Sequence, residues 1–139
     1  MAGHKSINHV WLNLRFAQMV VSRGASVELE PKPVKLSKGG FYYPDQIVTT
    51  DGQRLYVECE TMTETDMPLP TRMDKWDGYY VTTQTFNVVV PNTNAQKRLL
   101  NELARWQVER KASVRIRICD MYTVKREGPL WTYDRQFGR

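Results

Sequence analysis

Three acidic side chains stand at the ends of two short β-type segments in the middle of the chain. Asp45 lies near the start of the first segment, and Glu58 and Glu60 end the second. Asp51-Gly52, between the segments, is a strong signal for a hairpin turn. A hairpin brings the start of its first strand beside the end of its second, and residues two apart on a strand share a face. We therefore expect the three carboxylates to converge at one end of a hairpin.

Such a cluster predicts a metal site. Without a cation, mutual repulsion would raise the pKa of at least one carboxyl group. A hard divalent ion such as Mg²⁺ or Mn²⁺ removes that penalty and prefers oxygen ligands. It can also activate a water molecule and neutralise charge that develops on a phosphate. The alternative is a set of strand-end acids in solvent, but burying an unpaired acid at the end of an apolar strand is costly.

Length and composition are those of a soluble protein with one core. The chain has 139 residues, 41% of them hydrophobic and 25% charged. It contains no apolar run of the ~20 residues that a membrane helix needs, and Met1 to Asn8 lack the apolar region of a signal peptide. Cys59 and Cys119 lie in apolar segments and predict buried thiols rather than a disulfide framework. A cytoplasmic setting fits these features.

Positive charge is concentrated on both sides of the acidic segment. The net charge is +5, and the bases gather at residues 32–38 and from residue 97 onward. The nucleic-acid-binding candidates are the loop residues Lys32, Lys35 and Lys38 and the strand residues Arg115 and Arg117, which could contact phosphates. The loop lysines could equally be solvated, and the arginines could protect an exposed strand edge.

The C-terminal tail mixes bases with aromatic residues. Trp131 is representative: it could stack on unpaired nucleotides or pin the tail to the core.

Hydrophobic periodicity predicts the elements that must position these residues. We expect helices at 5–22, 71–80 and 95–110, and strands at 27–30, 42–49, 55–60, 85–90 and 114–118. The second helix would open on a capping box at Thr71 and Asp74, and Trp11 and Trp106 lie on apolar helix faces, so we expect them in the core. The order α-β-β-β-α-β-α-β predicts an α/β (α+β) protein with a mixed sheet covered by helices on both faces. Residues 1–139 would form one domain, with a core at about 4–118 and a tail at 119–139.

The acidic hairpin also resembles a known nuclease core. Tyr43-Pro44-Asp45-Gln46-Ile47-Val48, the Asp51-Gly52 turn and Leu55-Tyr56-Val57-Glu58-Cys59-Glu60 resemble the PD-(D/E)xK superfamily, whose topology is α-β-β-β-α-β. Within it, the chain is most similar to the nuclease-like domain of replication-relaxation proteins of plasmids and conjugative elements. The resemblance covers roughly residues 4 to 110, and its other counterparts are His4 to Asn13, Thr61 with Glu64, Lys75 with Tyr79, and Val89-Val90-Pro91-Asn92.

The resemblance implies that Asp45 and Glu58 bind the metal, with Glu60 as the third residue of the site. Glu60 stands where the superfamily normally has a lysine. Some restriction endonucleases resemble this E-x-E arrangement, and others take the lysine from a neighbouring helix. Lys75 is the candidate for that second route, with Tyr79 on the same helix face. The alternative for Lys75 is a solvated lysine in a short helix.

Two further residues are accessory candidates. Many active members carry an acid in the first helix, but no Asp or Glu precedes Glu28 here. His9 could take that place, or simply lie on the surface. Glu64 is either a loop acid or a residue that supports the metal ligands.

The sequence thus predicts a DNA endonuclease that hydrolyses phosphodiester bonds with Mg²⁺ or Mn²⁺. The alternative within the same fold is a catalytically degenerate module that binds DNA or protein in mobile-element or phage DNA processing. An unrelated small α/β interaction module is a third interpretation. The expected partners are DNA and, for double-strand cleavage, a second copy in a homodimer or a larger DNA-processing complex.

Overall fold

The computed structural model describes residues 7–62 and 69–138. The described helices are α1 (Ile7–Ser22), α2 (Leu69–Thr83) and α3 (Thr93–Arg110). The described strands are β1 (Ser26–Leu29), β2 (Val34–Lys35), β3 (Phe41–Tyr42), β4 (Gln46–Thr50), β5 (Gln53–Cys59), β6 (Thr85–Val90), β7 (Val114–Asp120) and β8 (Tyr133–Phe137). None of the described helices has the length and apolar character needed to cross a membrane.

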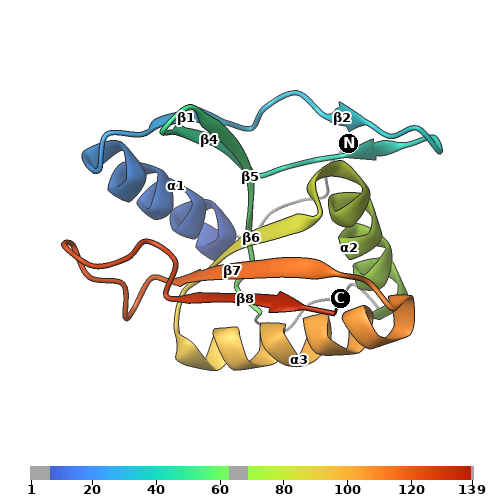
Figure 1. The fold of residues 1–139 in the computed structure, drawn as a ribbon. Helices are drawn as coiled ribbons and strands as arrows, with labels where there is room; N and C mark the ends of the chain where they lie inside the picture. Colours follow the sequence, from blue (N-terminus) through green and yellow to red (C-terminus); the bar gives the residue numbers. More distant parts are fainter. Residues whose placement is uncertain (1–6, 63–68, 139) are drawn as a thin grey trace.

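Six of the strands form one mixed sheet in the order β1-β4-β5-β6-β7-β8. β1, β4 and β5 pair antiparallel, β5, β6 and β7 pair parallel, and β8 returns antiparallel to β7. Because parallel neighbours need a crossover, α2 connects β5 to β6 and α3 connects β6 to β7 (Figure 1). The predicted mixed α/β architecture is confirmed at this level.

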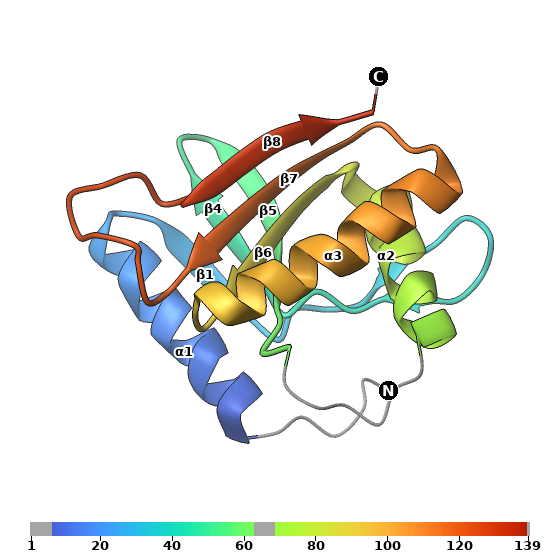
Figure 2. The same ribbon diagram turned by 90° about the horizontal axis from the view of Figure 1, so that it is seen from below.

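Helices cover both faces of the sheet, as predicted. α1 packs on one face, where Leu12, Phe16 and Val20 join a buried cluster with residues of β4 to β7. α2 and α3 pack on the other face around Trp76 and Trp106. Figure 2 shows α3 lying across β6 and β7 on the side away from α1. The protein therefore has two cores, one on each side of a single sheet.

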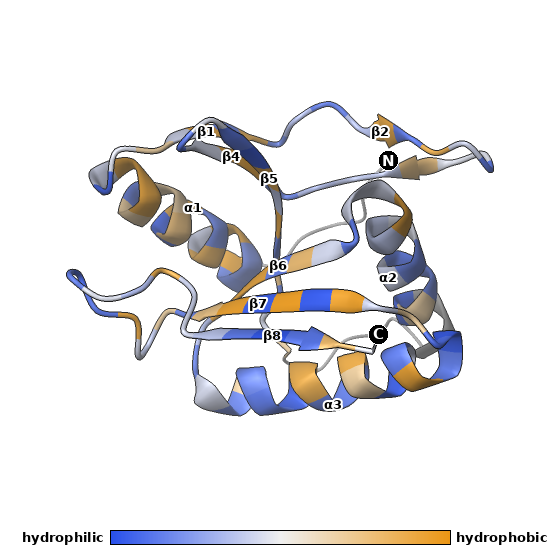
Figure 3. Cartoon of the chain, in the orientation of Figure 1, coloured by the Kyte–Doolittle hydropathy of each residue, from blue (hydrophilic) through white to orange (hydrophobic). Residues whose placement is uncertain are grey.

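Alternation along β5 decides which core its acidic residues join. Val57 and Cys59 lie in the α1-side core, whereas Tyr56 packs against the α2–α3 side. Because successive side chains of a strand point to opposite faces, Glu58 points toward α2. The same alternation along β7 is visible in Figure 3 as alternating hydrophobic and hydrophilic residues.

The buried strand predicted at 85–90 is confirmed, and the following helix begins earlier than predicted. Residues 86–90 of β6 are all buried. Asn92 caps α3 by accepting a hydrogen bond at 2.9 Å from the Ala95 N–H, so the helix starts at Thr93. An Asn at this position satisfies an amide that has no partner within the helix.

Four local predictions were wrong. α2 begins at Leu69, so Thr71 lies inside the helix and does not open it as predicted. The strand expected at 42–49 is two strands in different sheets, because β3 pairs with β2 in a separate two-stranded sheet. For the same reason the basic loop before Gly40 is partly a hairpin. Trp11 is 62% exposed, because the buried face of α1 runs through Leu12, Phe16 and Val20 instead.

The C-terminal tail contains an additional strand that its sequence pattern did not predict. β8 pairs with residues 114–118 of β7, so that Arg115 lies opposite Gln136 and Arg117 lies opposite Asp134. β7 is therefore an internal strand, and the edge-protection alternative for its arginines was wrong. Tyr133 and Phe137 are only half-buried, which left the strand with too little apolar periodicity to be recognised.

Candidate active site

Asp45 lies directly before β4, beside the end of β5. Its backbone N–H donates to the Val57 carbonyl at 3.1 Å, and its Oδ2 accepts the Cys59 N–H at 2.8 Å. The residue is 3% exposed. The hairpin register, which pairs Gln46 with Val57, thus brings the Asp45 carboxylate to the β5 backbone next to Glu58, as the hairpin prediction requires.

Glu58 is buried on the α2 side of β5 with both carboxylate oxygens in contact with side chains. The Tyr42 hydroxyl donates to Oε2 at 2.7 Å, and Lys75 Nζ lies 3.1 Å from Oε1. Tyr42 can reach this position because β3 belongs to the separate two-stranded sheet and not to the main sheet that contains β4. Sequence reasoning missed Tyr42, since a break between two strands leaves little periodic signal.

Glu60 follows β5 and is tied to β6 by its N–H, which donates to the Val89 carbonyl at 2.8 Å. Its Oε2 pairs with Lys75 Nζ, and its Oε1 accepts from Arg72 Nη2 at 2.9 Å. Both cations come from α2, three residues apart and therefore on one helix face. Lys75 of α2 thus lies between Glu58 and Glu60 and is not the solvated lysine of the alternative interpretation.

A second layer of contacts holds Arg72 in turn. Its Nε donates to Glu102 Oε1 of α3 at 2.7 Å, and Trp76 Nε1 donates to Glu102 Oε2 at 2.6 Å. Negative and positive side chains therefore alternate from Glu102 of α3 through Arg72 of α2 to Glu60, which follows β5. Arg72 could have been suggested by its i, i+3 spacing to Lys75, but nothing in the sequence points to Glu102.

The electrostatics of the cluster follow from burial and from these neighbours. Burial raises the pKa of Glu58 to about 7, although Lys75 opposes the shift. Burial alone would lower the pKa of Lys75, but the carboxylates of Glu60 and Glu58 outweigh it and raise the pKa above its usual range. Burial would also raise the pKa of Glu60, yet Lys75 and Arg72 lower it. Lys75 is therefore an ammonium and Glu60 a carboxylate at neutral pH, while Glu58 titrates near neutrality.

α1 reaches the site with polar groups from its inner face. His9 Nε2 lies 3.2 Å from Asp45 Oδ2. Asn13 is buried one turn further along the helix, and its Nδ2 lies 3.5 Å from the Asp45 carbonyl. His9 thus stands beside Asp45 in a helix that has no acid of its own.

Tyr79 supports the site through backbone atoms and through Tyr42. Its hydroxyl accepts the Asn87 N–H at 2.8 Å and donates to the Tyr56 carbonyl. Its ring stacks on that of Tyr42, with centroids 5.0 Å apart. Tyr79 shares a helix face with Lys75 as predicted, but it packs behind Tyr42 rather than beside the acids.

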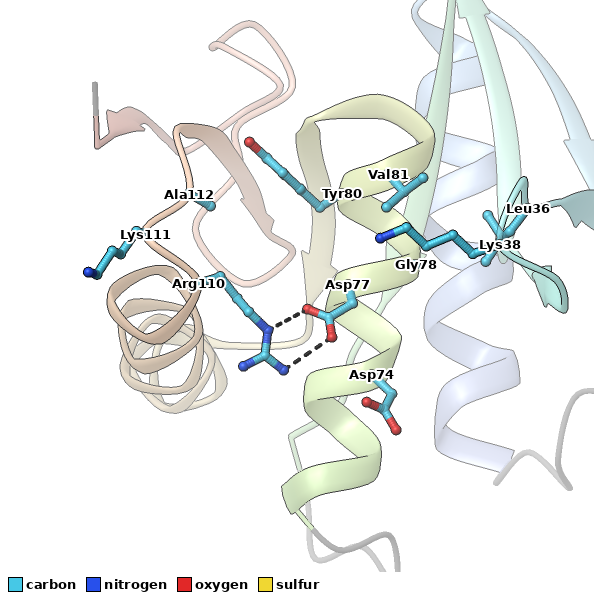
Figure 4. A pocket seen from close by; sticks show the side chains of 10 residues that line it. All are labelled: Leu36, Lys38, Asp74, Asp77, Gly78, Tyr80, Val81, Arg110, Lys111 and Ala112. Carbon is cyan, nitrogen blue, oxygen red and sulfur yellow. Dashed lines mark hydrogen bonds and ion pairs between the residues drawn. The ribbon is translucent and has the colours of Figure 1, made fainter.

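The predicted DNA-binding residues lie outside this cluster. Lys32, Lys35 and Lys38 are exposed. Lys38 lines a groove of about 620 Å³ between the β2–β3 hairpin, α2 and the end of α3 (Figure 4). Arg110, on the opposite wall, pairs with Asp77 through Nε at 2.8 Å. The groove is bordered by residues of α2 other than Lys75, so it is a separate feature.

The β7 arginines contact other residues of the protein. Arg115 makes two contacts of 2.8 Å with Asp134 of β8. Arg117 donates to Asn87 Oδ1 at 2.8 Å and lies over the Trp131 ring, 5.3 Å from its centroid. Both arginines thus already have partners within the protein. Glu64, the remaining candidate, lies outside the described residues.

Asp45 and Glu58 are the described side chains that could hold a divalent ion, as a two-carboxylate site. Within residues 7–62 and 69–138, no three His, Cys, Asp or Glu side chains gather closely enough to hold a metal by themselves. Asp45 and Glu58 offer hard oxygen donors, and Mg²⁺ commonly takes one or two carboxylates and completes its shell with water and phosphate. Comparison of the chain with protein-family models, curated proteins and solved structures found no match.

Proposed function

We propose that the protein is a Mg²⁺- or Mn²⁺-dependent DNA endonuclease of the PD-(D/E)xK type, in which α2 supplies the lysine. The observation that carries this proposal is the position of Lys75, whose Nζ lies 3.1 Å from Glu58 Oε1 and also contacts Glu60. The superfamily needs an acid pair and a lysine at one place. Asp45, Glu58 and Lys75 provide these groups, although they come from three different elements.

The connectivity supports the same proposal. α1 is followed by the three antiparallel strands β1, β4 and β5, then by α2 and the parallel strand β6. This connectivity fits the α-β-β-β-α-β order that the resemblance implies when the β2–β3 hairpin is counted as an insertion. α3, β7 and β8 extend the sheet beyond that core.

Each residue would have a distinct role in phosphodiester hydrolysis. Asp45 and Glu58 would hold the ion, which when bound supplies an activated water and neutralises phosphate charge. Lys75 remains protonated beside two carboxylates, so it stabilises negative charge on the phosphate rather than accepting a proton. Glu60, predicted as a third ligand, is placed to hold Lys75, and His9 to orient Asp45.

The proposed substrate is DNA, and the proposed setting is the cytoplasm. Exposed Lys32, Lys35 and Lys38 would contact the DNA backbone by charge without reading its sequence. Two-fold pairing of chains would place two sites on one duplex for double-strand cleavage. The free, buried thiols of Cys59 and Cys119 suit a reducing cytoplasm.

The test is cleavage of supercoiled plasmid and branched DNA with Mg²⁺ or Mn²⁺. Asp45→Asn, Glu58→Gln and Lys75→Met should each lower the cleavage rate by about 100-fold or more. Lys97→Met, an exposed lysine of α3, is the matched control and should cleave like the wild type. Absence of cleavage by the wild-type protein on every DNA and with both metals would contradict the proposal, as would full activity in Asp45→Asn.

A degenerate nuclease fold that binds DNA is the second candidate, and one observation favours it. Glu58 and Glu60 each have both carboxylate oxygens in contact with protein donors. A network this complete could persist as a structural feature after catalysis was lost. In that case the wild type would bind DNA without cutting it, and Lys75→Met would change thermal stability but not DNA affinity.

A further inference from the structure

A metal that binds Glu58 would approach oxygens that already contact two protein side chains. Glu58 Oε2 accepts from the Tyr42 hydroxyl and Oε1 faces Lys75. An ammonium and a divalent cation repel each other strongly at one oxygen in a buried site. Metal binding at Glu58 and the observed position of Lys75 are therefore in competition.

Lys75 is the group that can move. Tyr42 is 5% exposed and its ring is held against Tyr79. The Lys75 side chain is 29% exposed, compared with 3% for Glu58 and 7% for Glu60. Lys75 also has a second carboxylate partner in Glu60, so leaving Glu58 does not leave the ammonium unpaired.

We propose that Lys75 is the counter-ion of Glu58 in the metal-free protein. When a divalent ion binds, Lys75 leaves Glu58 Oε1 to the ion and stays paired with Glu60. The proposal rests on the metal site of the proposed function and adds the order of events at that site. Before metal binding, Lys75 compensates Glu58. Afterwards, the freed side of the ammonium is available to a phosphate oxygen of the DNA.

The other contacts of Glu60 explain why Lys75 stays paired with it. Arg72 binds the other Glu60 oxygen at 2.9 Å and is itself held by Glu102 at 2.7 Å. Glu102 accepts from Trp76 as well. Glu60 is thus held through Arg72 by α2 and α3, whereas the ion-pair partners of Lys75 within the described residues are the side chains of Glu58 and Glu60. This arrangement also gives a reason for an acid at the position where the superfamily has a lysine: it retains a lysine that arrives from a helix.

Mn²⁺ affinity without DNA tests the competition directly. Titration calorimetry or Mn²⁺ electron paramagnetic resonance would compare wild type, Lys75→Met and Lys97→Met, after circular dichroism has shown that each is folded. Lys75→Met should bind Mn²⁺ about tenfold more tightly, a usual size for coupling between two linked binding events. Lys97→Met should match the wild type, and adding Asp45→Asn to Lys75→Met should abolish binding.

Lysine labelling provides a second measurement in the unmodified protein. Amine modification read by mass spectrometry should increase several-fold at Lys75 when Mn²⁺ is added, because one of its two partners is lost. The Asp45→Asn protein, which should not hold the ion, is the control and should show no increase.

The outcomes separate this proposal from the proposed function. Equal or weaker Mn²⁺ affinity in Lys75→Met, or unchanged labelling of Lys75 in a wild type that binds Mn²⁺, overturns the counter-ion role and leaves the metal site intact. Failure of both wild type and Lys75→Met to bind Mn²⁺ overturns both proposals, because Asp45 and Glu58 would then not form a metal site.

Discussion

Two regions of the protein contain closely paired charges but differ in their exposure to water. In the α2–β5 cluster, the side chains of Arg72 and Glu60 are 11% and 7% exposed and lie 2.9 Å apart. On the β7–β8 surface, the side chains of Arg115 and Asp134 are 50% and 36% exposed and lie 2.8 Å apart. Contact distances alone would rank the two pairs as equals.

The difference between them is desolvation. An exposed charge that loses its partner is solvated by water, so surface pairs contribute little. A buried charge that loses its partner stays in a medium that cannot solvate it, so its loss is strongly destabilising. The buried cluster is therefore expected to be sensitive to single substitutions that remove one of its charges.

Removal of Arg72 should give the largest effect. Arg72→Met leaves Glu60 and Glu102 without their shared cation, so the free energy of unfolding should fall by about 3–5 kcal/mol. Urea denaturation at pH 8 measures it. Arg105→Met, which breaks an exposed helical pair with Glu109, is the matched control. A loss below about 1 kcal/mol in Arg72→Met would place the buried cluster in the same class as the surface pairs.

Glu58 should give an intermediate effect that depends on pH. Its pKa is raised from 4.5 to about 7 by burial, so between these values the folded protein keeps a proton that the unfolded chain has released. The contribution of Glu58 to the free energy of unfolding is therefore fully present below pH 4.5. It declines as the pH rises to 7, by at most about 1.4 kcal/mol per pH unit. Glu58→Gln removes that dependence.

The measurement is urea denaturation of Glu58→Gln and wild type from pH 4.5 to 8. The stability of the variant relative to wild type should increase with pH by up to about 3 kcal/mol over the range. Glu28→Gln, an exposed residue of β1, should follow the wild-type profile. A difference between Glu58→Gln and wild type that stays constant with pH would show that Glu58 is ionised throughout.

The smallest effect should come from the surface pair. Arg115→Gln breaks both contacts with Asp134, yet the free energy of unfolding should fall by at most about 1 kcal/mol. Added salt should shrink the difference further, because screening acts on exposed charges. Thermal denaturation at low and high salt measures both points. A loss comparable with that of Arg72→Met would mean that exposure does not separate the two regions.

Local sequence patterns predicted much of the framework. The β4–β5 hairpin around Asp51-Gly52, the buried strand β6 and helices on both sheet faces follow from periodicity and turn chemistry, which act over a few residues. The same reasoning brought Asp45 to the end of β5 beside Glu58. Periodicity failed for Trp11 and for β8. A hydrophobic repeat identifies the buried face of an element only when that face is clearly more apolar than the other faces.

The tertiary structure alone decided how the acidic residues are compensated. Lys75 meets Glu58 and Glu60 because the α2 crossover packs on the face of β5 that carries both acids. Tyr42 joins from β3, which lies in a separate sheet, and Glu102 joins from α3. Sequence spacing shows which residues of one element share a face, but not which face of another element will pack against it. The sequence by itself therefore determined the position of the acids, and only packing determined their cations.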